Sequence, residues 1–72
     1  MSSPKNSSEV LFGNAIKKHS AGKHFDTQKI CKRVLKSNPK DAEALNLIAV
    51  SYLNTGQNQK ALSAMEKANA LN

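Results

Sequence analysis

The sequence repeats itself at an interval of 34 residues. Shifting the chain by that distance aligns identical or similar residues and places a glycine at the same point of each copy. Intervals of about 20–50 residues are typical of proteins built by stacking one supersecondary unit on another. The aligned pairs include Glu9/Glu43, Leu11/Leu45, Ala15/Ala49, Ile16/Val50, Gly22/Gly56, Thr27/Ala61, Cys31/Met65, Val34/Ala68 and Asn38/Asn72. We therefore expect two similar units that stack side by side.

Apolar residues recur at helical spacing in four segments that turn residues separate. Gly22 and Pro39 predict where the first two helices stop, because glycine adopts the left-handed backbone freely and proline donates no amide hydrogen bond. Asp41 is a good N-cap for the third helix. The predicted helices run from Glu9 to near Gly22, from Phe25 or Asp26 to Asn38, from Asp41 to Leu53 and from about Gln59 to Leu71. No segment alternates as a strand would, so the sequence predicts an all-α fold.

The length and composition restrict what such a chain can do. A chain of 72 residues has room for one small domain, whose core rarely contributes more than about 3–5 kcal/mol. The one cysteine, Cys31, excludes an internal disulfide framework. No stretch approaches the roughly 18 apolar residues of a membrane span, and residues 1–8 have the polar composition of a disordered tail rather than of a signal peptide. We therefore expect a cytoplasmic protein.

Positive charge is concentrated in the first half of the chain. The formal net charge is +6, and residues 1–40 hold nine of the 11 basic residues. Four of them form a basic stripe on the polar side of the second predicted helix: Lys29, Lys32, Arg33 and Lys36. The stripe is either a solvated face or a site for an anionic partner, which could be an acidic protein, a lipid surface or nucleic acid. Nucleic acid is the less favoured partner, because the chain has only three aromatic residues for base stacking.

Residues 42–72 resemble a tetratricopeptide repeat. The matching positions, in the family's order of large, large, small, aromatic, turn, small, large and small, are Leu45, Ile48, Ala49, Tyr52, Gly56, Ala61, Met65 and Ala68. Residues 9–41 resemble a more divergent copy through Leu11, Ala15, Gly22, Cys31, Val34 and Pro39. The departures in this copy are Asn14, Lys18, Phe25 and Thr27. An atypical repeat is expected at the end of an array.

The resemblance implies an interaction scaffold. In this family, stacked helix pairs form a right-handed superhelix whose concave face, lined by the first helix of each pair, binds peptides or partner helices. Carried over by position, the groove would be lined by Glu9, Phe12, Ile16, His19 and Ser20 of the first unit and by Glu43, Asn46, Val50, Leu53 and Asn54 of the second. Phe12 and Ile16 occupy positions where the subclass that binds chaperone tails has lysine and asparagine, so that carboxylate clamp is absent and an apolar ligand is favoured. The alternative is that these apolar residues are covered by the chain itself, by a further repeat or by a second subunit.

Nothing in the sequence predicts catalysis or a cofactor. The five acidic residues are spread over four helices, and no glycine-rich loop precedes a lysine–serine pair. His19 and His24 lack the further ligands that a metal site needs. Cys31 lies at a predicted core position, where a free cysteine behaves as a small apolar residue. We expect an adaptor without enzymatic activity, cofactor or metal.

The far side of the second unit predicts self-association or a longer array. Stable stacks usually have three or more repeats and polar ends, and this chain has two units and no polar capping helix. The residues expected to meet water in part, or a second copy, are Leu47, Leu62, Met65 and Leu71.

Overall fold

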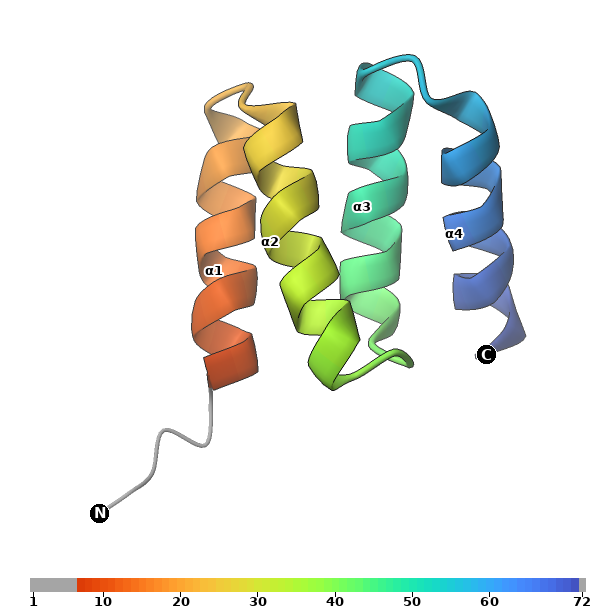
Figure 1. Ribbon diagram of the computed structural model, residues 1–72, viewed down its shortest axis with the longest axis horizontal. Helices are drawn as coiled ribbons and strands as arrows, with labels where there is room; N and C mark the ends of the chain where they lie inside the picture. Colours follow the sequence, from red (N-terminus) through yellow and green to blue (C-terminus); the bar gives the residue numbers. More distant parts are fainter. Residues whose placement is uncertain (1–6, 72) are drawn as a thin grey trace.

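The computed structural model describes residues 7–71, and over that range it consists of four helices joined by short turns (Figure 1). The helices are α1 (Ser7–Ser20), α2 (His24–Ser37), α3 (Ala42–Asn54) and α4 (Asn58–Ala70). Consecutive helices run antiparallel, and α2 packs between α1 and α3 while α4 packs on α3. α1 also touches α3. The predicted all-α fold of repeated helix pairs is confirmed.

The ends of the helices follow the local sequence closely. The side chain of Asp41 accepts a hydrogen bond from the Ala44 amide at 3.0 Å, which is the predicted N-cap of α3. Gly22 and Gly56 have φ angles of +77° and +76°, the left-handed conformation in which other residues are strained. Both hairpins therefore turn at the equivalent glycine.

The predicted boundaries need small corrections. α1 begins at Ser7, so the last two residues assigned to the tail belong to a helix. The rest of the predicted tail, 1–6, lies outside the described residues. α2 begins one residue before Phe25. α4 begins and ends one residue before the predicted Gln59 and Leu71. Helix ends are set by competition between local caps, so a shift of one or two residues is ordinary.

Small residues line the interfaces between the helices, as the repeat pattern predicts. Ala15 and Ala61 are fully buried, and Ala49 and Ala68 are 1% and 4% exposed. Larger side chains at these points would separate axes that pack about 8–10 Å apart. Thr27 replaces the expected alanine and is also fully buried. Its hydroxyl can be buried because it donates a hydrogen bond to the Lys23 carbonyl at 3.0 Å.

A buried polar network joins the two hairpins. The Gln28 side chain amide donates to the Ser51 carbonyl at 3.2 Å and to the Thr55 hydroxyl at 3.0 Å. Its carbonyl accepts a hydrogen bond from Gln57 Nε2 at 3.1 Å, and the Ser51 hydroxyl donates to the His24 carbonyl at 2.8 Å. Gln28 is 5% exposed and Ser51 is fully buried, so this network holds α2, α3 and the turn after α3 in one arrangement.

Candidate functional site

The apolar groove predicted on α1 and α3 is largely exposed. Ile16, Val50 and Leu53 are 44%, 42% and 47% exposed, while Phe12 is half-buried. The polar positions Asn46 and Asn54 are exposed on α3. We use the name apolar groove for Phe12, Ile16, Val50 and Leu53. Phe12 and Ile16 lie on one face of α1, and Val50 and Leu53 lie on one face of α3, because residues three or four apart share a helix face. The contact between α1 and α3 brings these two helices together.

His19 is placed differently from the other predicted groove residues. Its ring packs against that of His24 within the first hairpin, with ring centroids 5.5 Å apart. The Nδ1 atoms of both histidines are buried and have no hydrogen-bond partner within the described part of the chain. The His19 side chain is therefore directed at its own hairpin, and we leave it out of the groove.

Acidic residues lie beside Phe12, one of the predicted groove residues. Phe12 lines a hollow of about 180 Å³ together with Gly13 of α1 and three carboxylate residues, Glu9, Asp41 and Glu43. Two of the three lie in the first turn of α1 or α3, where a carboxylate is favourable to the helix dipole, and Asp41 caps α3. An apolar surface with a local negative charge is suited to a segment that carries both apolar and basic side chains.

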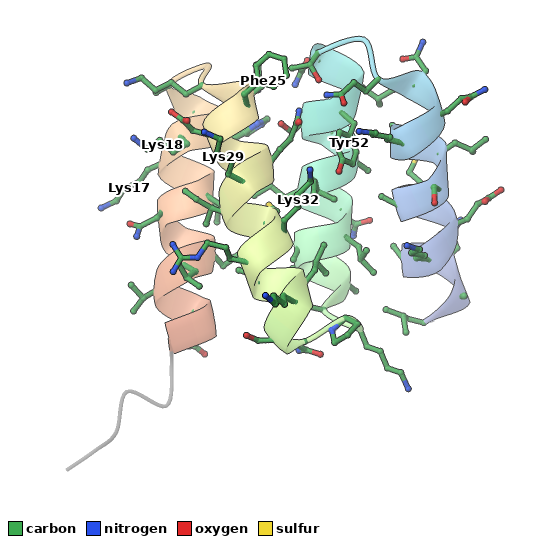
Figure 2. All side chains as sticks on the ribbon, viewed as in Figure 1. Lys17, Lys18, Phe25, Lys29, Lys32 and Tyr52 are labelled. Carbon is green, nitrogen blue, oxygen red and sulfur yellow. The ribbon has the colours of Figure 1, made fainter. Side chains whose placement is uncertain are left out.

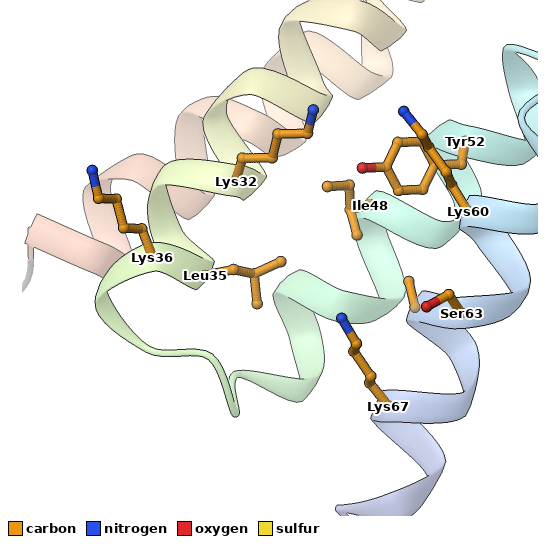
Figure 3. A pocket seen from close by; sticks show the side chains of 9 residues that line it. Lys32, Leu35, Lys36, Ile48, Tyr52, Lys60, Ser63 and Lys67 are labelled. Carbon is orange, nitrogen blue, oxygen red and sulfur yellow. The ribbon is translucent and has the colours of Figure 1, made fainter.

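The four residues of the basic stripe do not act as one unit in the structure. All four are exposed on α2, where Figure 2 labels Lys29 and Lys32. Only Lys32 and Lys36 line a hollow of about 450 Å³ (Figure 3). The opposite wall is formed by Lys60 and Lys67 of α4. We call this the basic hollow, and its full lining is Lys32, Leu35, Lys36, Ile48, Tyr52, Lys60, Ser63, Ala64 and Lys67.

The two lysines of α4 were not predicted as site residues. Lys60 and Lys67 belong to a half of the chain with a slight excess of acidic residues, so charge counting assigned them no role. A local signal was present, because the two are seven residues apart and therefore share one face of a helix. Their partners on α2 become visible only when α2 and α4 are placed on either side of α3.

Tyr52 joins the basic hollow to the core. The Nζ atom of Lys60 lies 5.8 Å from the centre of the Tyr52 ring, within the range of a cation–π contact. Tyr52 is 8% exposed, and this burial, followed by the nearby Cys31, raises the pKa of its hydroxyl. The phenol is therefore neutral in the physiological range and adds no negative charge to the lysines around it.

The environment of Cys31 does not activate its thiol. Cys31 is fully buried, and burial together with the charge of Asp41 raises the pKa of its thiol from 9.0 to about 11. The thiol is therefore protonated near neutral pH, whereas a nucleophilic cysteine needs a lowered pKa. The described residues contain no group of three or more His, Cys, Asp or Glu side chains placed to hold a metal ion.

The residues predicted for self-association divide into two pairs. Leu62 and Leu71 are 57% and 39% exposed at the α4 end of the stack. Leu47 and Met65 are half-buried against the core. Only the first pair is freely available on the surface.

Together these features define a helical-repeat protein with exposed surfaces between and beside its helices. Residues 30–63 match the family model described as Tetratricopeptide repeat. The matched segment begins in α2, contains all of α3 and ends in α4. Residues 30–63, just under half of the chain, are therefore similar to a tetratricopeptide repeat, which confirms the resemblance found in the sequence.

Repeats of this family suggest a protein–protein interaction module and are generally scaffolds without enzymatic activity. No curated protein and no solved structure matches the chain. The helices within the described range are all too short or too polar to cross a membrane.

Proposed function

We propose that the protein is an adaptor whose two stacked units, 9–41 and 42–72, bind an extended or helical segment of another protein in the apolar groove. The observation that carries the proposal is the exposure of Ile16, Val50 and Leu53 on α1 and α3 of a repeat fold. Large apolar side chains grouped on a surface are typical of an interaction site. A rigid helical scaffold also reduces the entropy lost when a ligand is bound.

The acidic residues beside the groove narrow the chemistry of the ligand. Glu9, Asp41 and Glu43 lie beside Phe12, so the preferred segment carries a basic residue next to its apolar anchors. The proposal places this interaction in the cytoplasm, where the buried and unpaired Cys31 stays reduced.

Selection from a displayed library of random peptides tests this proposal. We expect the selected peptides to combine apolar and basic residues, and we expect Val50→Asp to weaken their binding about ten-fold or more, which is about 1.4 kcal/mol. The physical reason is that the variant places an unpaired carboxylate in the apolar contact. Affinities would be measured by fluorescence anisotropy with labelled peptides.

Val10→Asp is the matched control, because Val10 is 62% exposed on α1 and is not one of the groove residues. This variant should bind the selected peptides as the parent protein does. Selected peptides whose binding is unchanged by Val50→Asp would contradict the groove.

The exposed end of α4 supports a second proposal, that the protein associates with a copy of itself. Within the described chain α4 packs on α3 alone, so its other side is uncovered. Leu62 and Leu71 are exposed there, and Leu62 is the more exposed of the two. Two copies that meet through this face would cover Leu62 and Leu71, as a following repeat does in a longer array. The net charge of +6 opposes association, so salt should favour it.

Size-exclusion chromatography with light scattering measures the expected result. Dimers should form at high protein concentration, increase with added salt and be lost in the Leu62→Lys variant. A well-folded monomer at every concentration and salt level would contradict self-association. Leu62→Lys should leave the binding of the selected peptides unchanged, because its side chain lies outside the apolar groove.

A further inference from the structure

The basic hollow combines an apolar floor with positively charged walls. Leu35, Ile48, Ala64 and the ring of Tyr52 form the floor, and Figure 3 shows two lysines on each side of it. The lining contains no acidic residue. Four positive charges around one hollow repel one another, and a bound anionic group would relieve that repulsion.

The lysines along each wall are spaced like residues on one face of a bound helix. Lys32 and Lys36 are one helical turn apart along α2, which is about 6 Å, and Lys60 and Lys67 are two turns apart along α4, which is about 10 Å. Acidic residues at positions i, i+4 and i+7 of a bound helix have the same spacings. An apolar stripe between them would lie on the floor.

We propose that the basic hollow is a docking site for an acidic amphipathic segment of a partner protein. Its carboxylates would pair with the lysines of α2 and α4, and its apolar side chains would cover Leu35 and the floor beside it. A phosphate polyanion has no apolar groups to place on that floor. A second copy of the chain is disfavoured as the occupant, because its own net charge is +6.

This site is separate from the apolar groove. Val50 is two residues from both Ile48 and Tyr52, which is about 200° around α3, so the groove and the floor of the hollow lie on opposite sides of that helix. The two surfaces also differ in sign, since carboxylates lie beside Phe12 of the groove and the hollow is lined by lysines. The two proposals can therefore fail independently.

The test uses the full chain and a labelled synthetic helix with leucines on one face and glutamates on both flanks. Binding is followed by fluorescence anisotropy at low and high salt. We expect the affinity to fall about ten-fold in the double variant Lys32→Gln/Lys60→Gln, which is about 1.4 kcal/mol. We also expect binding to be lost when the glutamates of the probe are changed to glutamine or its leucines to serine.

The matched control is the double variant Lys29→Gln/Arg33→Gln. It removes the same charge from exposed positions of α2 that do not line the hollow, so the affinity should change less than about two-fold. Thermal unfolding of both double variants checks that each is folded.

Three results would overturn the proposal. The first is equal weakening by the two double variants, which would indicate general attraction to a basic protein. The second is inorganic polyphosphate binding as tightly as the helical probe with the same sensitivity to Lys32→Gln/Lys60→Gln, which would make the hollow a phosphate site. The third is the absence of measurable probe binding at low salt.

Discussion

The Ala49→Phe variant is expected to lose a large part of its free energy of unfolding. Ala49 is 1% exposed in the core cluster of α1, α2, α3 and α4 residues, and a ring at this position would force the packed helices apart. Overpacking costs typically about 1–3 kcal/mol and sometimes more. A domain of this size has about 3–5 kcal/mol in total. Urea denaturation followed by circular dichroism measures the loss.

Val50→Phe is the matched control for this prediction. The same side chain is introduced one residue further along α3, at a position that is 42% exposed. Exposed substitutions usually change stability by less than about 0.5 kcal/mol. An Ala49→Phe protein with the same urea midpoint of unfolding as the parent would contradict the close packing of the helices at Ala49.

The Gln28→Ala variant is expected to lower the free energy of unfolding by about 2–3 kcal/mol. The change removes three donor contacts and one acceptor contact at the junction of α2, α3 and the following turn. Buried polar groups that lose their partners cost about 1–3 kcal/mol each in desolvation. Partial relief comes from water that enters the space left behind. Chemical denaturation gives the difference in free energy.

Two further variants separate the network from packing and composition. Gln28→Met keeps most of the side-chain volume and removes the hydrogen bonds, so its loss should be close to that of Gln28→Ala. Gln59→Ala changes an exposed glutamine of α4 and should be nearly neutral. A Gln28→Met protein as stable as the parent would show that the network adds nothing to stability.

Local features of the chain were enough to predict the helices and their turns. Asp41 caps α3 through an amide three residues away, and the glycine of each hairpin supplies the left-handed conformation at its own position. Such effects depend on a few neighbouring residues, so they can be identified without knowing the fold. The missed start of α1 lies in residues whose polar composition carries little helical periodicity.

The candidate binding surfaces could be predicted only in part. Periodicity indicated which side of each helix is polar, so Lys32 and Lys36 were identified with the rest of α2. It gave no distance between α2 and α4, whose residues Lys36 and Lys60 are 24 positions apart in sequence. These two helices pack on α3 and not on each other. The Gln28 network was missed for the same reason, because its partners Ser51, Thr55 and Gln57 belong to the other hairpin.

The amino-acid pattern alone determined the helical hairpins, their duplication and the small residues at their contacts, because these depend on periodicity and on backbone preferences within each unit. The tertiary structure decided which charges and polar groups face one another. Stacking places α3 between α2 and α4, so lysines from oppositely charged halves of the chain surround one hollow, while the apolar side chains of Val50 and Leu53 are left exposed. Contacts of this kind depend on the packing of distant segments, which no local pattern of residues contains.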